Sequence, residues 1–191
     1  NKVLAVYVGP AGYAAVGQFQ NAVQMITTFA SGAINTGVTK YTAEYESDLE
    51  KQRVVWRTAG TISVSASIFL SILILIFSEE LALWFLKDAS FAGVFVWFSL
   101  ALVFFSLNSL LLAILNGKRE IVRYVLANIS GSLFSLIATA LLAMKLGLYG
   151  ALVGLAIYQS LSFLATLIFC FRLTWFKFKF LFGKVDYATS A

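Results

Sequence analysis

Four stretches of this chain carry no charged residue, and each is long enough to cross a lipid bilayer as a helix. They are Thr58–Ser78, Ala89–Gly117, Tyr124–Met144 and Leu146–Phe171, with 21, 29, 21 and 26 residues. A bilayer's hydrocarbon core is about 30 Å thick and a helix rises about 1.5 Å per residue, so about 20 apolar residues span it. A fifth uncharged stretch, Val3–Thr39, contains Gly9 and Pro10, which we expect to end one helix before the next begins. The sequence therefore predicts an all-α, polytopic transmembrane helix bundle.

The composition fits a membrane protein and argues against an enzyme. Hydrophobic residues make up 60% of the chain and charged residues 12%, against about 45–50% and about 25% in soluble domains. The chain has no histidine, and its single cysteine, Cys170, excludes an internal disulfide and a cysteine-based zinc site. It contains no Walker loop, HExxH motif or nucleophile elbow. We expect no cofactor, no metal and no enzymatic activity.

Lysine and arginine alternate between the connections of the expected helices. Successive connections hold 0, 4, 1, 3, 1 and 4 of these residues. Cytoplasmic connections of membrane proteins are rich in lysine and arginine, so segments 40–57 and 118–123 and the tail after Phe171 are predicted to be cytoplasmic. The net charge of +5 is then a signal of topology, and we expect no nucleic-acid partner.

These patterns predict one truncated helix followed by five complete ones. The expected helices are 1–8 in part, 13–38, 58–78, 91–117, 124–144 and 149–171. The chain begins inside a helix and without methionine, so we expect it to be a piece of a longer protein. Residues 1–172 are predicted to form a transmembrane lobe and residues 173–191 a cytoplasmic linker.

Polar residues gather on one face of the expected helix 13–38. At about 100° per residue, seven polar side chains share an arc of about 120°: Gln20, Asn21, Gln24, Thr27, Thr28, Ser31 and Asn35. Amides that faced lipid would lack hydrogen-bond partners. The stripe either lines a water-filled cavity or bonds to neighbouring helices. Its size favours the cavity, and we expect Gln20, Asn21, Gln24, Thr28, Ser31 and Asn35 to bind substrate.

Lys2 is the second candidate. It precedes Pro10 by eight residues, which places it about 12 Å along a helix from the expected outer turn. A lysine at membrane depth costs about 2.5–3.5 kcal/mol on insertion scales, so it needs a partner. No acidic residue of this chain is expected at that depth. Either an anionic ligand such as a phosphate neutralises Lys2, or its side chain reaches the interface or a partner outside this sequence.

Small residues form stripes on three of the other helices. Such faces are typical of helices that pack closely in membranes. The stripes are Gly60, Ser63, Ser67 and Ser71; Asn128, Gly131, Ser132, Ser135 and Thr139; and Gly150 with Gly154. We expect packing roles for all three.

Several segments resemble a known family. They are Lys2–Val6, Gly9–Gly12, Gln18–Asn21, Gly32–Tyr41, Leu111–Arg119, Asn128–Ser132 and Gly147–Leu152. They are similar to bacterial O-antigen flippases, which are polysaccharide transporters of the multidrug/oligosaccharidyl-lipid/polysaccharide exporter superfamily. The sequence Gly37-Val38-Thr39-Lys40-Tyr41 is the most specific part of the resemblance, which covers essentially the whole chain.

The resemblance implies two six-helix lobes around a central cavity, of which this chain would be the first lobe with a truncated first helix. It implies movement of an undecaprenyl-pyrophosphate-linked oligosaccharide across the bacterial inner membrane by alternating access, during O-antigen and lipopolysaccharide biosynthesis. A proton or a sodium ion would be the coupling ion.

Within this scheme, each candidate residue receives a role. The polar stripe would meet sugar hydroxyls, Lys2 the pyrophosphate, and Lys40 the headgroup at the cytoplasmic mouth. Arg57, Lys118 and Arg119 would steer the same anion, although a role in setting orientation explains them equally well.

Two other functions remain open. A cation-coupled multidrug exporter usually needs a carboxylate inside the membrane, whereas every acidic residue here is expected in a connection or the tail. A non-transporting membrane scaffold would bury the polar stripe in helix contacts. A membrane-embedded enzyme has the least support, because no helix carries paired acids or a His/Cys cluster.

The orientation can be tested by cysteine labelling in a Cys170→Ser background. Ser47→Cys should react with a membrane-impermeant thiol reagent only from the cytoplasmic side, and Ser90→Cys only from outside, because the basic connections stay in the cytoplasm. Reversed labelling would contradict the predicted topology.

Overall fold

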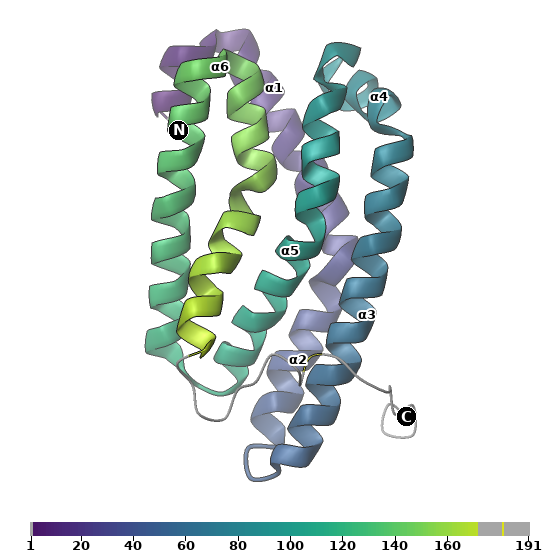
Figure 1. Ribbon diagram of the computed structural model, residues 1–191, viewed down its shortest axis with the longest axis vertical. Helices are drawn as coiled ribbons and strands as arrows, with labels where there is room; N and C mark the ends of the chain where they lie inside the picture. The colour runs from purple at the N-terminus through teal and green to yellow at the C-terminus, as the bar shows by residue number, and fades with distance from the viewer. Residues whose placement is uncertain (1, 172–180, 182–191) are drawn as a thin grey trace.

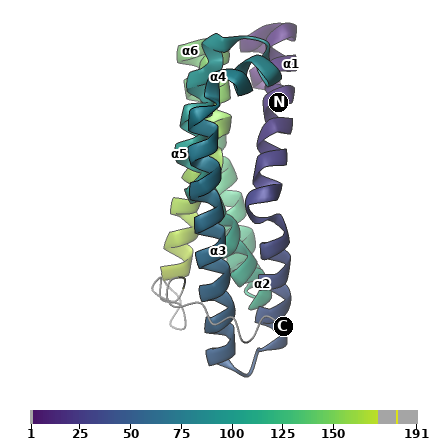
Figure 2. The same ribbon diagram turned by 90° about the vertical axis from the view of Figure 1, so that its right-hand side faces the viewer.

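The structure is an all-helical bundle. This computed structural model describes residues 2–171 and Leu181, except for the side chains of residues 2–11, 31–33, 159 and 171. Its helical elements, in chain order, are α1 (Lys2–Thr27), the π-helix η1 (Thr28–Gly32), α2 (Ala33–Glu44), α3 (Leu49–Ile76), α4 (Ser78–Leu81), the π-helix η2 (Ala82–Leu86), the 3₁₀-helix η3 (Ala89–Phe91), α5 (Ala92–Gly117) and α6 (Ile121–Phe171). Figures 1 and 2 show the long helices running side by side.

Three helical segments of the described part are long and apolar enough to cross a membrane: Leu49–Ile76, Ala89–Gly117 and Ile121–Cys170. The last of these contains Gly147, whose φ of 58° and ψ of −136° break the helical geometry. The chain reverses there, so α6 consists of two antiparallel helices (Figure 1). Glycine suits this position because it adopts a positive φ without a steric penalty. The predicted class, an all-α polytopic membrane bundle, is confirmed.

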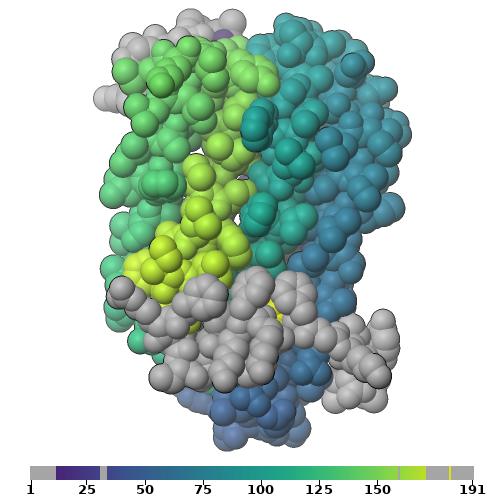
Figure 3. Space-filling view, in the orientation of Figure 1, coloured from purple at the N-terminus to yellow at the C-terminus, as the bar shows by residue number. Residues whose placement is uncertain are grey.

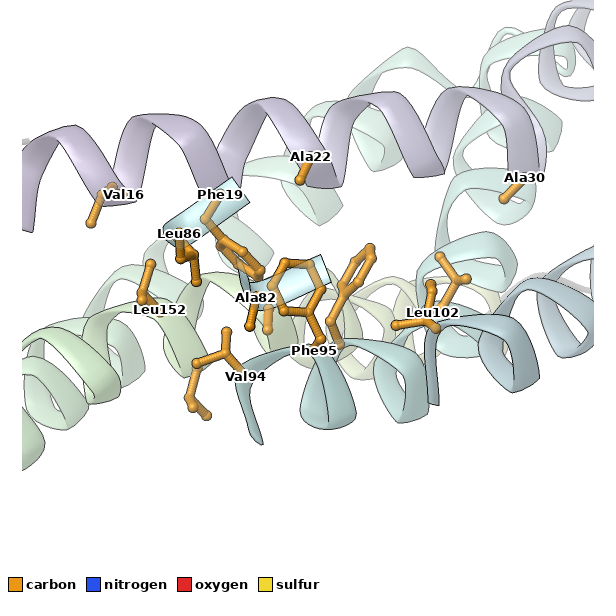
Figure 4. Packing of buried hydrophobic residues seen from close by; sticks show 14 residues of the cluster. Val16, Phe19, Ala22, Ala30, Ala82, Leu86, Val94, Phe95, Leu102 and Leu152 are labelled. Carbon is orange, nitrogen blue, oxygen red and sulfur yellow. The ribbon is translucent and has the colours of Figure 1, made fainter. Parts of the chain in front are cut away.

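Helix α5 occupies the centre of the bundle. Side chains along its whole length are buried, from Val94 to Leu115. Phe95 and Phe98 contact Phe19 of α1 edge to face, with ring centroids 5.5 and 6.2 Å apart. Figure 4 shows these apolar side chains between α1 and its neighbours. A second apolar cluster surrounds Trp56 and Ile114 toward the other end of α5.

Each of the three small-residue stripes has members that lie in close contacts between helices, as predicted. The hydroxyl groups of Ser67 on α3 and Ser106 on α5 are hydrogen-bonded to each other. Ser135 donates to the carbonyl of Tyr158, at 2.7 Å, between the two halves of α6. A Cβ atom added to Gly150 would lie 2.0 Å from the carbonyl oxygen of Leu142. Only glycine allows this approach between the two halves.

The expected helix break at Gly9-Pro10 is wrong. Helix α1 includes both residues and continues to Thr27, although it changes direction near its start (Figure 1). Proline removes one backbone donor and its ring pushes against the preceding turn, which bends a helix. Membrane helices tolerate proline because neighbouring groups satisfy the freed carbonyl.

The expected loop 40–57 is largely helical. Helix α2 extends to Glu44 and α3 begins at Leu49, so the helices 13–38 and 58–78 are both longer than predicted. The side chain of Asp48 accepts a hydrogen bond from the backbone of Lys51 and caps α3. Gln52 donates to the carbonyl of Thr42, at 2.7 Å, and Trp56 donates to its hydroxyl, at 2.9 Å. These buried bonds hold α2 and α3 together as a helical hairpin.

The described basic connections lie at the same end of the bundle. The turn between α2 and α3 and the turn between α5 and α6 meet there (Figure 1), and Arg119 lies 3.8 Å from Glu46. The short helices α4, η2 and η3 lie at the opposite end (Figure 1). The described connections rich in lysine and arginine thus lie at one end of the structure, and the connection through α4, η2 and η3, which has few of them, lies at the other. The predicted linker 173–191 lies outside the described residues except for Leu181, which is buried.

The packing of α6 can be tested with a matched pair of glycine substitutions. Gly150→Ala should lower the melting temperature of the detergent-solubilised protein, because the new methyl group meets backbone and overpacking costs about 1–3 kcal/mol. Gly37→Ala should leave it unchanged or raise it, since no atom lies within 4 Å of the added Cβ and alanine favours a helix by about 1 kcal/mol. Equal melting temperatures for both variants would show that the two halves of α6 are not closely packed.

Candidate functional site

A cavity of about 500 Å³ lies between α1, α5 and α6. The described residues that line it are Phe19, Gln20, Val23, Gln24, Thr27, Phe105, Leu155 and Tyr158. Figure 3 shows the surface hollowed between α5 and α6. The cavity volume is within the range of small-molecule binding sites, about 300–1,000 Å³.

Two amides of α1 form the polar side of this cavity. Gln20 and Gln24 are four residues apart, so their side chains lie one above the other on the same face of the helix. Both are exposed, and neither amide makes a hydrogen bond to the described part of the chain. Thr27 donates its hydroxyl to the carbonyl of Val23, at 2.7 Å. The two glutamines therefore keep their donors and acceptors for a ligand or for water.

Aromatic side chains surround these amides. Phe19 is fully buried, and Phe95 and Phe98 hold its ring in place. Phe105 reaches the cavity from α5 and Tyr158 from the second half of α6. The combination of apolar walls and a few polar groups is typical of a binding site for a small polar molecule.

The hypothesis of a continuous polar stripe is only partly consistent with this geometry. Gln20, Gln24 and Thr27 line the cavity, together with the apolar Phe19 and Val23 of the same helix. Asn21 and Thr28 are exposed and do not line it. Ser31 and Lys2 belong to the helical backbone, but their side chains lie outside the described residues.

Asn35 shows why the stripe divides. Its amide nitrogen donates to the hydroxyl of Ser109 on α5, at 3.0 Å. Between Gln24 and Asn35 lies η1, whose π-helical turns contain an extra residue relative to an α-helix. Each later side chain therefore points in a different direction from that given by 100° per residue. Asn35 consequently packs against α5 and does not line the cavity.

The cationic candidates lie toward the end of the bundle formed by the basic turns. Lys40 is exposed, and its ammonium group lies 5.4 Å from the centre of the Tyr41 ring. Arg57 is half-buried, and its Nε is buried without a partner in the described part of the chain.

Two other cations at this end face carboxylates of the same chain. Arg119 lies 3.8 Å from Glu46. Burial lowers the pKa of Lys118, and the carboxylates of Glu46 and Glu120 act in the opposite direction. Their charge is thus partly balanced inside the protein. Among the residues that the structure describes, no three His, Cys, Asp or Glu side chains come together as a metal site.

Sequence reasoning missed the α5 and α6 walls of the cavity. Phe105 and Leu155 belong to long apolar runs with no distinguishing pattern. Tyr158 offered a weak signal, because it is a polar aromatic residue four positions after Gly154 inside an uncharged stretch. Only the packing of the helices shows that these side chains meet the glutamines of α1.

Comparison with known proteins now adds to the geometry. Residues 2–189 match the family model described as polysaccharide biosynthesis protein. The chain is 29% identical over 161 residues to the lipid III flippases of Escherichia coli (strain K12) and Shigella flexneri. The alignment covers 84% of this chain and 38% of each relative, so the chain spans well under half of their length. No solved structure shows significant similarity.

The family match extends over nearly the whole chain. It confirms the resemblance to polysaccharide transporters that the sequence motifs indicated. The chain belongs to the polysaccharide biosynthesis protein family.

Proposed function

We propose that this chain forms part of a flippase that moves a lipid-linked oligosaccharide across a membrane. The observation that carries the proposal is the pair of exposed, unpaired amides, Gln20 and Gln24, in a cavity of a membrane helix bundle. The family match and the names of the two relatives support it. The protein is a transporter in this account, not an enzyme.

The finer details follow the family resemblance. The substrate would be an O-antigen-type unit on undecaprenyl pyrophosphate, used for lipopolysaccharide biosynthesis, and the membrane would be the bacterial inner membrane. Residues 1–172 would act as one lobe, with a second lobe completing a central cavity. Alternating access, driven by a proton or sodium ion, would carry the headgroup from the cytoplasmic to the outer leaflet.

The amides suit the sugar part of such a substrate. A carboxamide offers two donors and an acceptor, and each sugar hydroxyl both donates and accepts. A hydrogen bond made in exchange for water contributes about 0.5–1.5 kcal/mol. Two glutamines are therefore enough to distinguish a bound sugar from lipid while still releasing it. Such moderate affinity is what a transporter needs.

The partners of each cation decide whether we assign it to the headgroup or to the structure of the protein. Lys40 makes no ion pair with the described residues, and Arg57 has a buried Nε without a partner. We assign these two to the anionic pyrophosphate at the cytoplasmic mouth. Lys118 and Arg119 face carboxylates, so we assign them to the structure of this end. Lys2, Asn21, Thr28 and Ser31 remain substrate contacts predicted from the sequence alone, whereas Asn35, which the sequence also predicts to be one, packs against α5.

The alternatives have less support in the geometry. A cation exporter would use a carboxylate at its binding site, and none of the described residues that line the cavity is acidic. A scaffold would pair its membrane-embedded amides, as the amide nitrogen of Asn35 is paired with Ser109. The unpaired amides of Gln20 and Gln24 fit neither.

The double variant Gln20→Ala, Gln24→Ala, made in the full-length protein, tests the proposal. Transport of lipid-linked oligosaccharide into the outer leaflet of proteoliposomes should fall by about 5- to 150-fold, since two hydrogen bonds are worth about 1–3 kcal/mol together. Asn128→Ala is the matched control. It also removes an amide, but one whose only bond within the described part of the chain is to the carbonyl of Tyr124 in its own helix, at 3.0 Å.

Both variants must first be shown to reach the membrane at wild-type abundance. Transport near the wild-type rate in the double variant would contradict a substrate-binding role for the cavity. Equal losses in the double variant and in Asn128→Ala would assign the glutamines a structural role.

A further inference from the structure

None of the described residues that line the cavity carries a charge. Its polar groups are the amides of Gln20 and Gln24, the hydroxyl of Thr27 and the phenol of Tyr158, and the rest is apolar. A lipid-linked oligosaccharide has two chemically different parts, an anionic pyrophosphate and a saccharide. Because the described polar groups of its lining are uncharged, the cavity interacts differently with the pyrophosphate and with the saccharide.

An anion would be poorly stabilised here. A charged group in a site with apolar walls needs a cation or several converging donors to offset its desolvation. The cavity supplies amides and aromatic rings instead. Lys40 and Arg57, which we assigned to the pyrophosphate, are not among its lining residues.

An uncharged sugar fits the same surroundings. Its hydroxyl or acetamido groups match the donors and acceptors of the two glutamines. The C–H faces of a sugar ring are apolar and pack against aromatic rings, which Phe105 and Tyr158 supply from α5 and α6. The volume of about 500 Å³ suits a ligand of this size.

The walls are held at a fixed spacing. Ser160 donates to the carbonyl of Ala101, at 2.9 Å, and Thr166 donates to the side-chain oxygen of Asn108, at 2.7 Å. These two bonds join α5 to the second half of α6 on either side of Phe105 in the sequence. A site whose walls are already in place loses less entropy when a ligand binds.

We propose that the cavity is a subsite for an uncharged sugar of the transported glycolipid, and that Phe105 and Tyr158 determine its specificity. This inference rests on the proposed function and deepens it. The saccharide enters the cavity between α1, α5 and α6, while the pyrophosphate stays at the cationic end. Selectivity then depends on the sugar and not on the lipid anchor.

Neighbouring phenylalanines allow a direct test by photo-crosslinking. The photoreactive p-benzoylphenylalanine replaces Phe105, which lines the cavity, or Phe104, which is 48% exposed on the outside of the bundle. The native protein is irradiated in membranes whose glycolipid carries a radiolabelled neutral sugar. Position 105 should yield a sugar-labelled adduct at least tenfold more often than position 104, which should capture phospholipid.

The result separates the subsite from the proposed function. If the unmodified protein transports glycolipid but position 105 captures only phospholipid, the subsite is wrong and the flippase proposal stands. If the protein transports no glycolipid and neither position captures labelled sugar, both are wrong.

A change of specificity tests the role of charge independently. Gln24→Lys should reduce transport of a glycolipid with neutral sugars at least tenfold and raise the relative transport of one with an acidic sugar, because the new ammonium group attracts the carboxylate. Tyr158→Phe should raise the KM for the neutral substrate less than Tyr158→Ala does, since it keeps the ring. A damaged fold lowers transport of both substrates alike. If Gln24→Lys leaves the ratio of acidic to neutral glycolipid transport unchanged, the proposal of a sugar subsite is wrong.

Discussion

A helix bundle in a membrane must satisfy its polar groups internally, because lipid tails offer no hydrogen bonds. Helix α5 meets this requirement for most of the molecule. It receives hydrogen bonds from Asn35 of α2, from Ser71 of α3, and from Ser160 and Thr166 of α6. These bonds combine with its buried apolar side chains to fix three neighbours around one central helix. The positions of the cavity walls depend on this arrangement.

Because polar groups in a membrane need partners, the unpaired amides of the cavity differ from the other polar side chains of the bundle. Most polar side chains of the described spans are paired between helices or bonded to their own backbone, as Thr27 is. Gln20 and Gln24 are long amides that make no such bond, and they face an open volume beside Phe105 and Tyr158. A transporter needs such sites, because permanently paired groups cannot exchange partners with a moving substrate. The family of this chain and its similarity to lipid III flippases agree with that reading.

Sequence patterns predicted the apolar spans of α3, α5 and α6, whereas the binding roles of the candidate site residues stay predictions. Uncharged stretches locate membrane helices because burial in lipid excludes charge over a fixed length, and α5 (Ala92–Gly117) nearly coincides with the expected 91–117. The pattern failed where tertiary contacts decide the outcome. Helix α1 continues through Pro10. Thr42 extends the α2–α3 hairpin through its bonds to Gln52 and Trp56, and η1 redirects Asn35 toward Ser109. The side chains of Lys2 and Ser31 lie outside the described residues.

The central claim is that Gln24 faces an open binding cavity, whereas Asn35 of the same polar stripe is packed against α5. Thiol accessibility in the native protein tests it most directly, with Cys170 replaced by serine. Gln24→Cys should react with a small hydrophilic thiol reagent and be protected by added glycolipid, while Asn35→Cys should react at least tenfold more slowly with or without it. Equal reactivity at both positions, or no protection of Gln24→Cys by a glycolipid that the protein transports, would contradict the account.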